Sequence, residues 1–125
     1  MPDQEQILRD AYSYFANWSA NRQQFEALLD SDVQWIETDP GLTAKTYQGR
    51  ADVMAHVDDI QRKVTSANLV SVSSKPQGWQ TKDNMQVSTD AVHCCITDVS
   101  FTDNNLISQV NHCKGHAQNI GRRCS

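Results

Sequence analysis

Hydrophobic residues follow helical spacing near the start of the chain. They recur every three or four residues, which predicts an amphipathic helix through Ile7, Ala11, Tyr14, Phe15 and Trp18. Asp3 stands three residues before Gln6, a pattern typical of a helix N-cap. A second, shorter helix is expected to begin at Asn21, and a third to carry its apolar stripe from Val53 to Val64.

Alternation with a period of two marks the expected strands. Val33, Trp35 and Glu37 share one face of a strand over residues 32–38, which the Asp39-Pro40-Gly41 turn ends. From residue 68 onward the chain favours strands, the last two over about 92–101 and 106–113. Residues 76–90 carry no recognisable motif. Helices and one early strand followed by a run of antiparallel strands predict an α+β fold.

Length and charge narrow the function classes. A chain of 125 residues fits one domain over 1–125, with a core at about 5–113 and a polar, frayed tail at 115–125. The net charge of −4 and the lack of a basic stripe argue against a nucleic-acid partner. No apolar run approaches the ~20 residues of a membrane span, so no membrane partner is expected. The acidic start of the chain favours a cytoplasmic location.

Four local patterns carry a family resemblance: Tyr14-Phe15 with Trp18, the strand 32–37, Tyr47-Gln48-Gly49-Arg50, and Asp98–Phe101 leading to Leu106-Ile107. Together they resemble the nuclear transport factor 2-like superfamily, in its SnoaL-like and ketosteroid-isomerase-like branch. The resemblance covers about residues 5–113. It implies a cone in which three helices pack on a curved antiparallel sheet and enclose a pocket.

The resemblance also implies catalytic roles. Tyr14 corresponds to a tyrosine that polarises a carbonyl, Glu37 to a carboxylate that moves a proton, and Asp98 to an acid on a late strand. Three alternatives remain open, namely Tyr12 for Tyr14, Asp39 for Glu37, and Thr97 for Asp98. The other expected pocket residues are Trp18, Trp35, Val57, Ile60, Asp39, His56, Gln109 and Asn111.

The residues themselves support a role for Glu37. It continues an apolar strand face, where loss of solvent would raise the pKa of its carboxyl toward neutrality and make it a general base. The alternative is a solvated glutamate at a strand end. Tyr14 is either a pocket donor or a core tyrosine.

The closing hairpin offers further polar residues. With a turn centred on Asp103-Asn104, Asp98 lies opposite Gln109, and Ile96 lies opposite Asn111. This face either forms the polar end of a pocket or points outward to solvent or a partner.

Cysteines and histidines cluster at the ends of the same strands. In this register Cys94 faces Cys113, and Cys95 faces His112. Adjacent strand residues point to opposite faces, so these side chains cannot all converge, and we expect no metal site. Free thiols are expected, with a Cys94–Cys113 disulfide as the alternative in an oxidised sample.

The combined expectation is an enzyme that needs no cofactor. It would isomerise, cyclise or dehydrate a small apolar molecule through a general base and oxyanion support. The alternatives are a small-ligand-binding protein without catalysis and a dimeric interaction protein. A homodimer through the sheet is expected in each case.

Overall fold

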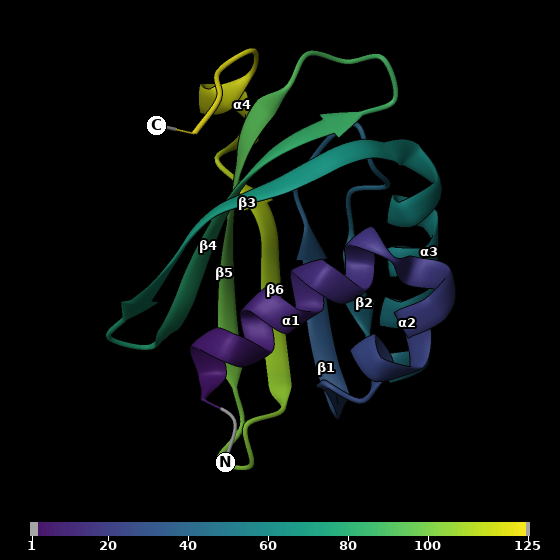
Figure 1. Cartoon of the computed structure of the whole chain (residues 1–125), viewed down its shortest axis with the longest axis vertical. Coiled ribbons are helices and arrows are strands. Elements are labelled where there is room, and N and C mark those ends of the chain that lie inside the picture. The colour runs from purple at the N-terminus through teal and green to yellow at the C-terminus, as the bar shows by residue number, and fades with distance from the viewer. Residues whose placement is uncertain (1–2, 125) are drawn as a thin grey trace.

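The fold is a curved sheet of six strands with helices packed on it (Figure 1). The computed structural model describes residues 3–124. Helices α1 (Gln4–Ala16) and α2 (Trp18–Glu26) come first, followed by strands β1 (Leu29–Glu37) and β2 (Thr46–Gln48) and by helix α3 (Arg50–Lys63). The remaining elements are β3 (Val64–Lys75), β4 (Gly78–Val87), β5 (His93–Phe101), β6 (Ile107–Lys114) and the short helix α4 (His116–Asn119). This confirms the predicted α+β cone.

The strand order places β1, the first strand of the chain, beside β6, the last. The order is β2-β1-β6-β5-β4-β3, and β1 runs parallel to β6 while every other pair is antiparallel. Glu37, the last residue of β1, therefore lies opposite His112 near the end of β6. None of the helices within residues 3–124 is both long and apolar enough to cross a membrane.

The first helix begins as the sequence predicts and ends earlier. The Asp3 carboxylate accepts a hydrogen bond from the Gln6 backbone N–H at 2.7 Å, which confirms the N-cap. Asn17 then leaves the helical conformation with φ −130° and ψ 59°, so α2 begins at Trp18. The prediction that Trp18 closes the first helix and that the second begins at Asn21 is therefore wrong.

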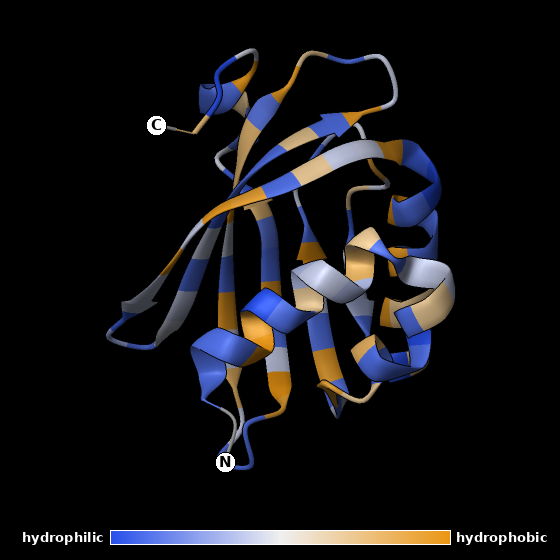
Figure 2. Ribbon diagram, viewed as in Figure 1, coloured by the Kyte–Doolittle hydropathy of each residue, from blue (hydrophilic) through white to orange (hydrophobic). Residues whose placement is uncertain are grey.

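The core lies between the concave face of the sheet and the helices. Strands change repeatedly between hydrophobic and hydrophilic residues in Figure 2. Along β1, Val33, Trp35 and Glu37 are buried on one face, as alternation predicts. Val53 and Val57 of α3 are buried against this layer, at 0% and 1% exposure.

The cysteines differ from the sequence prediction. Cys94 is joined to Cys124 and Cys95 to Cys113, so neither free thiols nor a Cys94–Cys113 bond is correct. The β5–β6 register is shifted from the predicted one, with Asp98 opposite Asn111, and irregular between Ile96 and Asp98. Cys113 also has a positive φ of 53°, which breaks the alternation of faces and buries both His112 and Cys113.

The C-terminal segment is anchored, although the sequence predicts a frayed tail. Beyond the Cys94–Cys124 bond, the Cys94 N–H donates to the Arg122 carbonyl at 2.7 Å. The Cys124 N–H donates to Asn84 Oδ1 at 2.6 Å. Residues up to 124 are thus tied to β4 and β5.

Reduction of the disulfides should destabilise the protein. Each crosslink restricts the unfolded chain, and loss of one typically costs about 2–4 kcal/mol. We expect the paired substitutions Cys94→Ser and Cys124→Ser to lower the free energy of unfolding in urea by about this amount, and a reductant to remove the Cys95–Cys113 contribution as well.

The matched control is the same unfolding curve of the oxidised protein, combined with a thiol titration under denaturing conditions. Free thiols in the untreated protein, or a midpoint that a reductant leaves unchanged, would contradict this prediction.

Candidate functional site

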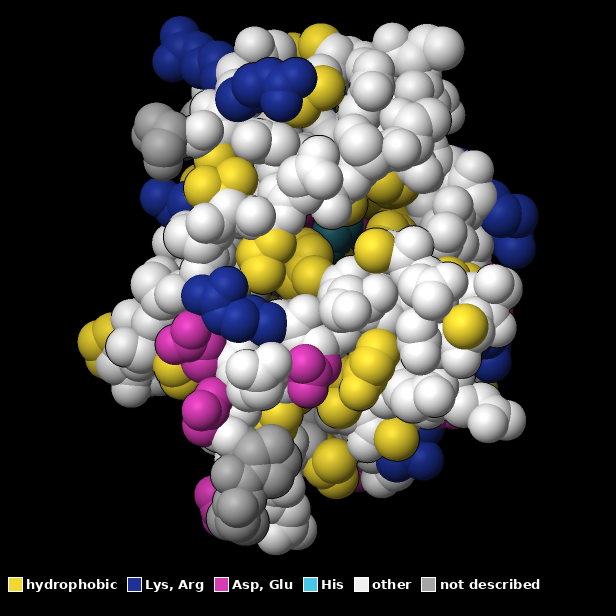
Figure 3. All heavy atoms as spheres, viewed as in Figure 1, with side chains coloured by type: hydrophobic (Ala, Val, Ile, Leu, Met, Phe, Trp, Pro, Cys, Tyr) yellow, Lys and Arg dark blue, Asp and Glu magenta, His cyan; other side chains and the backbone are white. Residues whose placement is uncertain are grey.

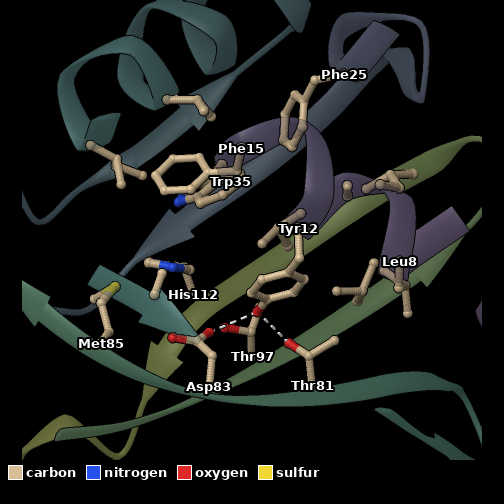
Figure 4. Close-up of a pocket in the computed structure, with 17 residues that line it drawn as sticks. Leu8, Tyr12, Phe15, Phe25, Trp35, Thr81, Asp83, Met85, Thr97 and His112 are labelled. Carbon is tan, nitrogen blue, oxygen red and sulfur yellow. Dashed lines mark hydrogen bonds between the residues drawn. The ribbon is translucent and has the colours of Figure 1, made fainter. Parts of the chain in front are cut away.

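A cavity of about 90 Å³ lies between the sheet and helices α1 to α3 (Figure 4). Its wall is largely apolar, and its lining includes Leu8, Phe15, Phe25, Trp35, Val57, Ile60, Met85, Val99 and Val110. Figure 3 shows a hollow in the region of α1 and β3, edged by hydrophobic side chains, with a histidine side chain at its floor. His112 is the histidine among the residues that line the cavity. An apolar wall with a few polar groups is typical of a small-molecule site.

The polar groups gather at one end of the cavity, around Asp83 (Figure 4). The Tyr12 hydroxyl donates to Asp83 Oδ2 at 2.7 Å and lies 2.8 Å from Thr81 Oγ1. Because Tyr12 has a single hydroxyl proton, Thr81 is the donor in the second bond. Thr97 of β5 lines the same end. One helix and two strands thus bring hydroxyl groups to this end of the cavity.

Asp83 is the least satisfied member of this group. Its side chain is almost fully buried, at 1% exposure, and Oδ1 has no hydrogen-bond partner. Burial raises the pKa of Asp83 above its ordinary value, although the hydrogen bond from Tyr12 opposes the rise. Burial and the adjacent Asp83 also raise the pKa of Tyr12. A buried carboxyl with one free oxygen is suited to proton transfer.

Glu37 is buried as the sequence predicts but is fully paired. Its carboxylate accepts hydrogen bonds from Trp35 Nε1 at 3.1 Å and from the Asp39 backbone N–H at 3.1 Å. His56 Nε2 and His112 Nδ1 each lie 2.9 Å away. Burial alone would raise the pKa of Glu37, but His112 and the other donors lower it to about 2. The predicted upward shift is therefore wrong, because the sequence did not reveal these partners.

His112 connects Glu37 to the cavity. Its Nδ1 faces the Glu37 carboxylate, and its ring lines the cavity. Burial by itself would lower the pKa of His112, but the negative charge of Glu37 raises it above the ordinary value. Nε2 lies 3.7 Å from Cys95 Sγ, so the ring is held on both sides. Glu37 itself does not line the cavity, but its partners His112 and Trp35 do.

The predicted residues on the helices divide into two groups. Tyr12, the alternative to Tyr14, lines the cavity, and Tyr14 is not among the lining residues. Val57 and Ile60 of α3 line it with Trp35 of β1. Trp18 is packed in the core and donates from Nε1 to Asp58 at 2.8 Å. His56 reaches Glu37 instead of the cavity.

The predicted polar face of the closing hairpin lies away from the cavity. Asp98 binds Lys75 and Lys114, and it borders a separate surface depression with Gln109 and Asn111. Assigning these three residues to the pocket was wrong, because the residues beside them in the alternating pattern face inward. These are Thr97 and Val99 on either side of Asp98, and Val110 between Gln109 and Asn111. Thr97 is the residue left open as the alternative to Asp98. Asp39 is buried beside His93 and is absent from the cavity lining.

Sequence reasoning missed Asp83, Thr81 and His112. Thr81, Asp83, Met85 and Val87 alternate on the buried face of β4, with intermediate residues between them. An aspartate at an inward position of an otherwise uncharged face is a signal that the sequence carries. Residues 76–90 match no motif, so the sequence predicts a strand there without a functional residue.

Comparisons with known proteins show the fold. Neither a protein-family model nor a curated protein matches the sequence. An NTF2-like protein from Burkholderia xenovorans superposes with a TM-score of 0.71 at 13% identity, over 87% of this chain and 86% of that one. A SnoaL-like protein from Shewanella denitrificans superposes with a TM-score of 0.67 at 10% identity, over 90% of each chain. A steroid delta-isomerase from Pseudomonas aeruginosa superposes with a TM-score of 0.59 at 15% identity, over 82% of this chain and 77% of that one.

Replacing the cavity carboxyl should stabilise the protein at neutral pH. The pKa of Asp83 is higher in the folded than in the unfolded state, so its ionisation at pH 7 opposes folding. Asp83→Asn cannot ionise, and we expect its Tm at pH 7 to be a few degrees higher. The difference should shrink as the pH falls through the raised pKa of Asp83 and should be lost below about 3.9, where the carboxyl is protonated in both the folded and the unfolded state.

Asp98→Asn is the matched control on the outer face. It removes exposed ion pairs with Lys75 and Lys114 and should cost no more than about 1 kcal/mol. A lower stability of Asp83→Asn than of the unmodified protein at pH 7 would show that the charged carboxylate stabilises the fold.

Proposed function

We propose that this chain, which has the nuclear transport factor 2-like fold, is a small-molecule enzyme that transfers protons without a cofactor. The observation that carries the proposal is the free oxygen of a buried carboxyl at the polar end of an apolar cavity. The fold is shared with a steroid delta-isomerase, but the fold alone does not assign an activity. The roles are argued from this chain's own side chains.

Asp83 is the proposed proton acceptor. Tyr12 holds Oδ2 in place, which leaves Oδ1 free to take a proton from the carbon next to a carbonyl group. The electron pair of the broken C–H bond then forms an enolate, and the proton returns to the same or another carbon. A raised pKa suits a carboxyl that must both accept and release a proton near neutral pH.

His112 is the proposed support for the negative charge of the enolate oxygen. Glu37 favours the protonated ring, and the ring lines the cavity that contains Asp83. A positive charge fixed before the reaction stabilises a developing oxyanion without reorganisation. This assignment replaces the predicted roles of Glu37 and Tyr14 with Asp83 and the Glu37–His112 pair, and it supports the predicted type of chemistry.

The size of the cavity limits the substrate. A cavity of about 90 Å³ is smaller than the ~150 Å³ engineered cavity that binds benzene. We therefore propose a carbonyl compound smaller than a six-membered ring, in place of a steroid-sized molecule. The apolar wall favours a hydrocarbon body with a single polar group at the Asp83 end.

The test measures binding and proton transfer separately. Short-chain and small-ring ketones and enones are added to the protein, and the Tm is recorded, since a ligand of the folded state raises it. For compounds that bind, NMR in heavy water follows exchange of the hydrogens next to the carbonyl. We expect exchange with the unmodified protein and a loss of about 10²- to 10⁴-fold in Asp83→Asn.

Asp98→Asn is again the control and should exchange at the unmodified rate. Exchange that survives in Asp83→Asn would remove Asp83 from the mechanism. Tight binding with no exchange by any bound ketone would identify a ligand-binding protein without catalysis.

The disulfides bear on where the protein works. Two disulfides that tie β5 to β6 and to the C-terminal segment fit an oxidising compartment better than the reducing cytoplasm. We therefore propose an oxidising location in place of the cytoplasmic one. The homodimer stays a prediction.

A further inference from the structure

Three residues from distant parts of the sequence meet at the end of the sheet near α4. Asp39 follows β1, His93 opens β5, and His116 opens α4. One carboxylate oxygen and one ring nitrogen from each histidine lie within 4.8 Å of one another. Asp39 and His93 are almost fully buried, at 1% and 2% exposure. None of the three lines the apolar cavity.

The facing atoms do not satisfy one another. Asp39 Oδ2 and His93 Nε2 lie 2.9 Å apart, and His116 Nδ1 lies 3.5 Å from Asp39 Oδ1. These are ion-pair distances, but the alignment is not that of a hydrogen bond, and Oδ2, Nε2 and Nδ1 have no hydrogen-bond partner. Buried polar atoms are normally partnered. Three such atoms converging on one point are oriented toward a common partner.

A backbone group fixes the orientation of the Asp39 side chain. The Gly41 backbone N–H donates to Asp39 Oδ1 at 2.9 Å, while Oδ2 faces His93 Nε2. Metal-binding histidines and carboxylates are commonly held in this way by a second hydrogen bond.

We propose that Asp39, His93 and His116 bind a first-row divalent transition-metal ion such as Zn²⁺. Two imidazole nitrogens and a carboxylate oxygen form a donor set that suits these ions better than Mg²⁺ or Ca²⁺. Ligand atoms about 2.0–2.1 Å from a tetrahedral zinc are about 3.3 Å apart. Asp39 Oδ2 lies 2.9 Å from His93 Nε2 and Asp39 Oδ1 lies 3.5 Å from His116 Nδ1, so each oxygen of the carboxylate faces one histidine at a separation close to this value. The partly exposed side of His116 leaves the fourth position to water.

The ion would join the C-terminal helix to the sheet. Its ligands come from the end of β1, from β5 and from α4, close to the Cys94–Cys124 bond that anchors the same segment. The sequence predicted no metal site, because alternation separates the cysteines and histidines of the closing strands and Asp39 is distant from them along the chain. Asp39, the remaining ligand, lies at the far end of the chain's first strand.

A second group of potential metal ligands requires that zinc binding be measured on the oxidised protein. Cys95, His112 and Cys113 also lie within 4.8 Å of one another, but their sulfurs are joined in a disulfide. Thiols freed by a reductant would bind zinc and confuse the result. The measurements therefore use the oxidised protein, stripped of metal with a chelator and then dialysed.

The test measures Zn²⁺ binding by calorimetry and the Tm with and without Zn²⁺. We expect one zinc per chain, a higher Tm with zinc, and no such effect of Mg²⁺. His116→Gln and Asp39→Asn should each weaken zinc binding at least tenfold. His116 is the most exposed ligand, so its variant keeps the test valid if Asp39→Asn does not fold. Asp98→Asn is the control and should bind zinc normally.

Cobalt gives an independent reading of the ligands. Co²⁺ at this site should show the visible absorption of a tetrahedral ion without the thiolate charge-transfer band. The proposal is overturned if the oxidised protein binds no zinc, if His116→Gln binds it as tightly as the unmodified protein, or if the thiolate band appears.

Discussion

The buried carboxylate of Glu37 is the interaction on which the centre of the structure depends. It lies at the end of β1 and is bound by His56 from α3 and His112 from β6, with Trp35 of its own strand. A buried charge is costly unless it is paired and hydrogen-bonded, so these partners must all be in place when the fold closes. The parallel pairing of β1 with β6 is what brings Glu37 and His112 opposite each other.

Four carboxyl groups of this chain differ in their partners, and their partners decide how each one behaves. Glu37 is paired with two histidines, Asp39 faces two others, and Asp98 is bound by lysines on the outer face. Asp83 has no positive partner at hydrogen-bond distance and keeps a free oxygen at the cavity. Burial disfavours the charged form of a carboxyl unless hydrogen-bonding and charged partners compensate, which is why the pKa of Glu37 falls and that of Asp83 rises.

The disulfides and the Glu37 group meet at the same place. Cys95 and Cys113 are joined beside the His112 ring, whose other nitrogen faces Glu37. The positive φ of Cys113 turns two consecutive residues of β6 inward. This local irregularity allows one strand to supply both a cavity residue and a crosslink to β5.

The sequence by itself determined the order of elements, the N-cap at Asp3 and the inward face of β1, because these depend on local periodicity and capping. It also identified Trp35, Val57 and Ile60, which line the cavity, and kept Tyr12 and Thr97 open as alternatives. Tertiary structure alone decided that Glu37 is paired with two histidines, because His56 and His112 lie 19 and 75 residues from Glu37 along the chain. It also decided the disulfide pairing. The alternation of hydrophobic and polar residues reveals neither the register shift between β5 and β6 nor the left-handed backbone conformation of Cys113.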